Sequence, residues 1–275
     1  MTLLYIIIAA LIGGVASIAV AALALAVKLQ SIDRWVAFAV GALLAVVFLD
    51  LLPHALDGGV VPSSLLAWVL GGLLFFFVLE KLVLWRHSHG ALTPPPAQPE
   101  ALAAANHPHH HHVHHDVHGH AIASGRPAGL TILLGDALHN ATDGVLIAAA
   151  FLADIKLGIV TSLAVIAHEI PQEVSDFFVL LHAGYSRAQA FAFNLMSSLA
   201  MVVGGVAGYL ALETAQAFVI PVLAFAAASM LYVAVADLIP TLHRRFSLTE
   251  TLWQIAMIAL GIGTVMLTHE LLHVH

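Results

Sequence analysis

The 275-residue sequence contains no cysteine and few charged residues. Without thiols, the chain cannot form disulfides, thiolate metal sites or cysteine-based catalytic centres. Lys and Arg together number 9 against 16 Asp and Glu, which gives a net charge of −7. A chain of this charge, with no basic patch, is excluded as a nucleic-acid binder, because that binding depends on cationic contacts to phosphates.

Charged residues make up 9% of the chain, whereas hydrophobic residues make up 61% and the mean hydropathy is +0.97. A soluble domain is about 45–50% apolar and about 25% charged. The composition therefore predicts an all-α integral membrane protein, which we expect in the cell (plasma or inner) membrane. The N-terminus has no basic region before its apolar run, so we interpret it as a first spanning helix and not as a cleaved signal.

Eight apolar runs are long enough to span a bilayer, which requires about 20 residues. They cover residues 3–27, 35–56, 65–85, 129–153, 157–182, 188–212, 216–242 and 252–272. The odd-numbered connections, together with the run ends beside them, hold every Lys and Arg except Lys156. Because Lys and Arg favour the cytoplasmic side, the pattern predicts both termini outside and a cytoplasmic third connection.

The third connection is long and rich in histidine. Such tracts bind metal by composition and need no fold, so we expect a disordered loop over 86–128 that collects or senses metal. An expression tag and a tolerated low-complexity insert are the alternatives. The candidate ligands in this loop are His107, His109, His110, His111, His112, His114, His115, His118 and His120. The loop divides the chain into helices 1–3 (1–85), helices 4–5 (129–182) and helices 6–8 (183–275).

Two polar clusters lie in the middle of the fourth and fifth apolar runs. The first reads GDALHNATDG and the second AHEIPQEVSDF. Spacings of three and four residues place the side chains of each cluster on one helical face or on an overlapping stripe. The first cluster comprises Asp136, His139, Asn140 and Asp143, and the second His168, Glu169, Gln172, Glu173 and Asp176.

The short connection at 153–157 predicts that these two helices pack antiparallel. Counted from it, the clusters reach a similar depth, roughly 15–22 Å at about 1.5 Å per residue. Both should therefore meet near the membrane midplane. Lys and Arg are absent from the interior of the apolar runs, so the buried carboxylates need another cation or must be protonated. Mixed imidazole, carboxylate and amide ligands favour Zn, Fe(II), Mn or Cd over Mg or Ca.

An internal echo links the second and seventh runs. FLDLLPHAL ends the second and VADLIPTLH ends the seventh, and the predicted topology orients these runs oppositely. The echo indicates an inverted repeat, a device of transporters in which sites form near the midplane. The predicted topology places Asp50 at the outer mouth and Asp237 at the inner mouth, either as path residues or as helix-end hydrogen bonders.

The motifs HNATDG and HEIPQE resemble those of the ZIP (Zrt/Irt-like) family of divalent metal transporters. The resemblance extends over nearly the whole chain, including FLDLLPHAL, LYVAVADLIP and residues 194–197. It implies a 3+2+3 arrangement of eight helices with an inverted repeat, an ion path through the fourth and fifth helices, and inward transport of metal. It also implies a primary metal site at His139, Asp143 and His168.

The resemblance further implies a second site with Asn140 and Glu169, which Asn194 could complete. Gln172 stands where this branch of the family usually has a second histidine, and this departure affects the expected ion preference. Independently of the family, we interpret Asp136 as a partner that orients an imidazole. Asp176 is either a relay carboxylate or a structural hydrogen bonder. Pro171 either kinks its helix or frees the carbonyl of Ala167 for the ion.

Four other readings of the sequence compete with a metal importer. An intramembrane zinc protease would use His168 and Glu169, but its HExxH motif requires a histidine where Gln172 stands. A cation-diffusion exporter would have six spans and a terminal soluble domain, and a metal receptor would need no path across the membrane. The histidines could also be simple interhelical hydrogen bonders. We therefore predict a non-enzymatic transporter with no permanent cofactor and a divalent metal as substrate; the oligomeric state, a homodimer included, stays open.

Overall fold

The computed structural model describes residues 1–27, 32–90, 126–243 and 247–273, and the elements in these ranges are helical. The predicted all-α fold is confirmed. The histidine-rich segment from His107 to His120 lies outside the described residues. The single helices are α1 (Thr2–Val27), α4 (Pro62–Gly90), α5 (Arg126–Ala153), α6 (Ile155–His182), α7 (Arg187–Thr214) and α10 (Leu248–His273).

Two further rods are composite and contain π-helical turns. The first joins α2 (Ile32–Ala45), η1 (Val46–Leu51) and α3 (Leu52–Asp57). The second joins η2 (Gln216–Phe218), α8 (Val219–Tyr232), η3 (Val233–Leu238) and α9 (Ile239–Leu242). The π-helical segments η1 and η3 fall on the two echo sequences, and each is followed by a short α-helix with a proline in its first turn. The two similar sequences thus adopt the same local backbone structure.

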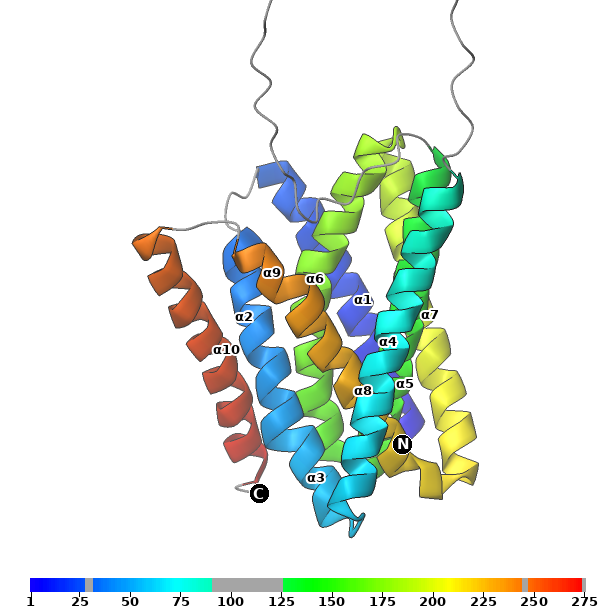
Figure 1. The fold of residues 1–275 in the computed structure, drawn as a ribbon, viewed down its shortest axis with the longest axis vertical. Helices are drawn as coiled ribbons and strands as arrows, with labels where there is room; N and C mark the ends of the chain where they lie inside the picture. The colour runs from blue at the N-terminus through cyan, green and yellow to red at the C-terminus, as the bar shows by residue number, and fades with distance from the viewer. Residues whose placement is uncertain (28–31, 91–125, 244–246, 274–275) are drawn as a thin grey trace, which may run out of the picture.

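The composite rods run in opposite directions, because α3 and α9 lie at opposite ends of the molecule (Figure 1). The main contacts between helices in one half of the chain have matching contacts in the other half. Helix α1 packs on α6 as α7 packs on α5, and α10 packs on α2 as α4 packs on α8. Helix α2 also contacts α6 as α8 contacts α5. These paired contacts support the predicted inverted repeat of three helices on each side of α5 and α6.

Six helical stretches in the described residues are long and apolar enough to cross a membrane. They are Thr2–Val20, Arg34–Asp57, Pro62–Leu82, Arg187–Thr214, Gln216–Leu242 and Leu248–Leu272. Helices α5 and α6 have 28 residues each and carry the two polar clusters at mid-length. The chain is therefore a multi-pass membrane protein, and the crossing by α5 and α6, which would bring the spans to eight, stays a prediction.

Glycines allow the backbones of α5 and α7 to approach each other closely. A Cβ on Gly144 would overlap the carbonyl oxygen of Met201, and a Cβ on Gly204 would overlap that of Ala141. Gly208 lies one turn further along α7, against Val145. The small-residue surface of α7 therefore packs within the fold and holds α5 close to α7.

Candidate metal centre

A tight turn joins α5 to α6 and makes them antiparallel neighbours. The Asp154 carboxylate caps α6 by accepting hydrogen bonds from the backbone N–H groups of Lys156 (2.8 Å) and Leu157 (3.1 Å). Such a cap satisfies donors that have no partner inside the helix. The predicted antiparallel pairing is confirmed, and it brings the two polar clusters to the same level.

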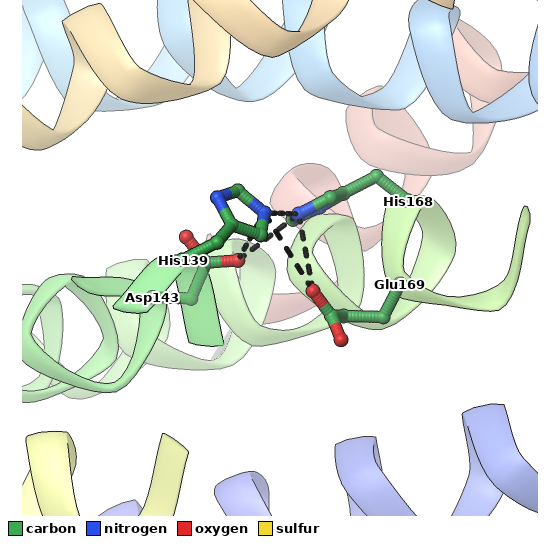
Figure 2. A group of neighbouring side chains, drawn as sticks. All are labelled: His139, Asp143, His168 and Glu169. Atoms are coloured by element: carbon green, nitrogen blue, oxygen red, sulfur yellow. Dashed lines mark hydrogen bonds and ion pairs between the residues drawn. The ribbon is translucent and has the colours of Figure 1, made fainter. Parts of the chain in front are cut away.

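Four side chains from the two clusters converge on one point (Figure 2). His139 and Asp143 come from α5, and His168 and Glu169 come from α6. One nitrogen or carboxylate oxygen from each lies within 4.8 Å of the others. His139 is 16% exposed, whereas the remaining three side chains are 2% exposed or less. The cluster is therefore enclosed, with its open side at His139.

The separations within the cluster suit a tetrahedrally bound metal. The Nε2 atom of His168 lies 3.0 Å from Asp143 Oδ2, 3.2 Å from His139 Nε2 and 3.6 Å from Glu169 Oε1. His139 Nε2 lies 3.6 Å from Asp143 Oδ2 and 3.7 Å from Glu169 Oε1. Ligand bonds of about 2.0–2.2 Å at tetrahedral angles put neighbouring ligand atoms roughly 3.3–3.6 Å apart. Five of the six separations thus lie within a few tenths of an ångström of these values, and the sixth, between Asp143 and Glu169, is at most 4.8 Å.

Hydrogen bonding prepares His168 to act as a ligand. Its Nδ1 lies 3.3 Å from the carbonyl oxygen of Ala164, one turn earlier in α6. A carbonyl only accepts, so Nδ1 carries a proton, and Nε2 is the nitrogen that faces the cluster. Asp143 Oδ2 and Glu169 Oε1 are buried and face the two imidazoles. Imidazole nitrogens and buried carboxylates that face one another favour a cation between them.

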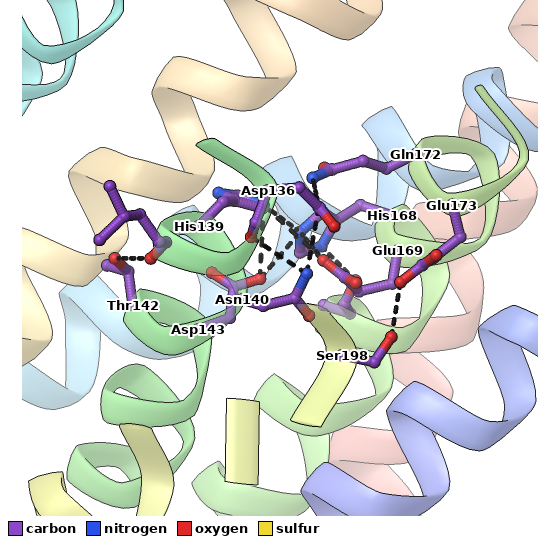
Figure 3. Close-up of polar contacts among 12 residues, drawn as sticks. Asp136, His139, Asn140, Thr142, Asp143, His168, Glu169, Gln172, Glu173 and Ser198 are labelled. Atoms are coloured by element: carbon purple, nitrogen blue, oxygen red, sulfur yellow. Dashed lines mark hydrogen bonds and ion pairs between the residues drawn. The ribbon is translucent and has the colours of Figure 1, made fainter. Parts of the chain in front are cut away.

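A second network lies one helical turn away, around Asp136 (Figure 3). Asp136 Oδ1 accepts hydrogen bonds from the side-chain amides of Asn140 (3.1 Å) and Gln172 (3.0 Å). We expected Asp136 to orient an imidazole, but the described partners of its side chain are these two amides and the carboxyl of Asp176. Gln172, a predicted ligand on α6, donates its amide hydrogen to Asp136 within this network.

The remaining predicted ligands lie on the side facing α7. Glu173 Oε1 accepts a hydrogen bond from Ser198 (2.6 Å), and Asn194 donates to the backbone carbonyl of Glu173 (3.0 Å). The sequence reasoning did not single out Ser198, although a hydroxyl in an apolar helix beside Asn194 was a usable signal. The carboxyl of Asp176, one turn beyond Gln172, lies close to Asp136 and Glu173.

Five buried oxygen atoms beside the cluster have no hydrogen-bond partner among the described residues. They are Asp136 Oδ2, Asn140 Oδ1, Glu169 Oε2, Glu173 Oε2 and Asn194 Oδ1. Buried polar atoms are normally paired, so a concentration of unpaired oxygens needs an explanation. Oxygen donors at this density can coordinate a cation, and Glu169 contributes one oxygen to the histidine cluster and a second to this group.

A cavity of about 290 Å³ opens at the end of the molecule where α3, α6 and α10 meet. Asp50 and His269 line it and contact each other, joining η1 to α10. Asp237 is on η3, towards the opposite end (Figure 1). The other polar lining residues are His54, Asp57, Asp154 and Lys156.

An all-helical membrane chain with histidines and carboxylates converging at mid-helix has the architecture of a transporter for metal ions. The chain matches the family model described as ZIP Zinc transporter over residues 1–269, and it belongs to this family. Members of this family are transporters, which excludes the intramembrane protease. Family membership likewise excludes the cation-diffusion type of exporter.

Named relatives agree with the family assignment. The chain is 32% identical over 263 residues to the human protein named Zinc transporter ZIP13. The matched region covers 86% of this chain and 70% of the human protein. It is 30% identical over 246 residues to the mouse protein of the same name, covering 84% and 68%. It is 40% identical over 109 residues to mouse Zinc transporter ZIP10, covering 40% of this chain and 13% of that one.

Proposed function

We propose that the protein moves a divalent metal ion, zinc in the first place, from outside into the cytoplasm by alternating access. The observation that carries this proposal is the convergence of His139, Asp143, His168 and Glu169 between two long helices. Two neutral imidazoles and two carboxylates balance the charge of one divalent ion. Fe(II), Mn and Cd fit the same ligand set.

The path runs along α5 and α6. The cavity at Asp50 and His269 forms the outer entrance, and the opposite end, where α5 begins, is the cytoplasmic exit. The distribution of Lys and Arg in the sequence supports this orientation. Inward movement of a divalent ion is favoured by about 4–5 kcal/mol at 100 mV, negative inside, so the membrane potential can drive import. Import from outside the cell also supports residence in the cell membrane.

A second ion position lies beside the first. Glu169 contributes to both, and Asn140, Glu173 and Asn194 supply further oxygens to the second. Their unpaired buried oxygen atoms support it. At the cytoplasmic end, the histidine-rich segment from His107 to His120 receives or senses the delivered ion.

Uptake of radioactive zinc into proteoliposomes tests the function. The wild-type chain should accumulate zinc under a negative-inside potential, whereas His139→Ala, Asp143→Ala and His168→Ala should each abolish most of that uptake. Thr142→Ala is a matched control on α5, because the Thr142 hydroxyl only donates to the backbone of Leu138 (2.8 Å). Uptake at the wild-type rate in all three ligand variants would contradict the assignment of the centre.

A further inference from the structure

Gln172 is the position at which the chain departs from the motif of its family, and the structure gives it a specific partner. Its amide nitrogen lies 3.0 Å from Asp136 Oδ1, across the contact between α6 and α5. Asn140 donates to the same oxygen from within α5 at 3.1 Å and to the Asp136 carbonyl at 3.2 Å. One carboxylate oxygen is thus held by amides from two helices (Figure 3).

The chemistry of these groups fixes which end of the Gln172 amide faces Asp136. An ionised carboxylate only accepts hydrogen bonds, so the NH₂ group of the amide must point towards it. An amide NH₂ has no lone pair for a metal. In this arrangement Gln172 acts as a tether between α6 and α5 through its NH₂ group.

The tether lies on a particular side of the centre. Asp136 precedes His139 by one helical turn of α5, and Gln172 follows His168 by one turn of α6. Both therefore stand between the four-residue cluster and the end of the molecule where α5 begins and α6 ends. Asp176 lies one further turn in the same direction, close to Asp136.

Asp136 keeps one carboxylate oxygen clear of the amides. The residue is 6% exposed, both amides donate to Oδ1, and the neighbouring carboxyl of Asp176 lies within hydrogen-bond reach of Asp136. Oδ2 is therefore held by neither amide. A glutamate at position 172 would instead place a second carboxylate against Asp136, and like charges at such a distance repel each other.

We propose that Gln172 is a positioning residue that holds Asp136 across α5 and α6 as the next acceptor for the ion leaving the centre towards Asp176. This inference rests on the proposed transport function. Asp136 on α5 supplies the carboxylate that accepts the ion, and the neutral amide of Gln172 keeps this carboxylate extended over the exit. The identity of the amide partner should therefore affect release of the ion more than its binding.

Exchanging the two side chains tests the inference. The comparison uses full-length wild type, Asp136→Asn, Gln172→Glu and the double variant, all in proteoliposomes with radioactive zinc. Each single variant should lower the maximal uptake rate about tenfold. The double variant again pairs one carboxylate with one amide, so it should recover to within about threefold of wild type. Equilibrium zinc binding in detergent should change less than about twofold in all four.

Two controls separate positioning from general damage. Gln189→Glu changes the same residue type at the exposed first turn of α7, where it pairs with Ser186, and should leave the uptake rate unchanged. Thermal unfolding in detergent should give similar midpoints for the four proteins. If the single variants unfold at clearly lower temperature, the pair is structural and the inference is wrong.

The outcomes also separate this inference from the proposed function. Suppose that wild type takes up zinc, that His168→Ala abolishes this uptake, and that the rate of the double variant falls by the product of the two single effects. The transport function would then stand, and only the role of Gln172 would be overturned. Wild-type rates for Gln172→Glu would overturn it in the same way. Absence of uptake by wild type would overturn both the transport function and the inference that rests on it.

Discussion

The Nε2 atoms of His139 and His168 face each other at 3.2 Å, although 29 residues separate them in the chain. The two rings are inclined at 74° to each other, so each Nε2 points into the space also reached by Asp143 and Glu169. This one contact joins the HNATDG and HEIPQE motifs into a single centre. The two sequence motifs thus contribute two side chains each to one cluster.

In the proposed function the two histidines hold the same ion, so the effects of their substitutions should not add. We expect His139→Ala and His168→Ala each to reduce zinc uptake at least about tenfold, and the double variant to be little worse than either single variant. Groups that work as a unit behave in this non-additive way. The measurement is initial zinc uptake by the three variants under one imposed potential. Multiplicative losses in the double variant would show that the histidines act at separate steps.

The close approach of α5 and α7 predicts a strong effect of one methyl group. Gly144→Ala places its Cβ against the carbonyl oxygen of Met201, and such overpacking costs typically about 1–3 kcal/mol. The thermal midpoint in detergent should fall, and uptake should fall with it. Gly135→Ala is the control on the same helix, because nothing lies within 4 Å of its new Cβ. Equal midpoints for the two variants would contradict the close packing described here.

Much of the centre was predictable from the sequence, because helical periodicity determines which residues share a face. The short turn at Asp154 determines the depth at which the faces of α5 and α6 meet. Periodicity does not determine side-chain rotamers, so the partners of individual groups were harder to predict. Asp136 was expected to orient an imidazole, whereas the structure pairs it with Asn140 and Gln172.

The fold shows the same division. The all-α membrane architecture follows from the apolar runs, whose length and composition are explicit in the sequence. The π-helical turns η1 and η3 were not predicted, because no residue pattern distinguishes a π-turn from an α-turn before a proline. The echo around Asp50 and Asp237 did mark their positions, and the structure shows that the repeated sequence adopts a repeated local backbone.

The histidine-rich segment should affect metal retention more than passage. We expect replacement of the nine histidines from His107 to His120 by serine to leave initial zinc uptake within about twofold of wild type, because the four-residue centre is intact. The amount of zinc bound per purified chain should fall, since imidazoles are the metal ligands of such tracts. Equilibrium dialysis and initial uptake measured on the same protein check both parts. Abolished uptake would show that the segment belongs to the path.

Lys156 should reduce the affinity of the outer entrance for cations. It lines the cavity together with Asp50, Asp57 and Asp154, so its positive charge opposes the attraction that these carboxylates exert on an incoming ion. Unit charges a few ångströms apart in water interact by about 1 kcal/mol. Lys156→Gln should therefore lower the KM for zinc uptake by about two- to fivefold and leave the maximal rate unchanged.

Salt and a second lysine provide the controls for this electrostatic argument. The difference between Lys156→Gln and wild type should shrink as ionic strength rises, because salt screens charges in water-filled spaces. Lys81 lies over the Phe77 ring on α4, away from the cavity, so Lys81→Gln should leave the KM at its wild-type value. An equal drop in KM for both variants would indicate an effect of net charge on the protein as a whole, and the cavity would lose its role as the entrance.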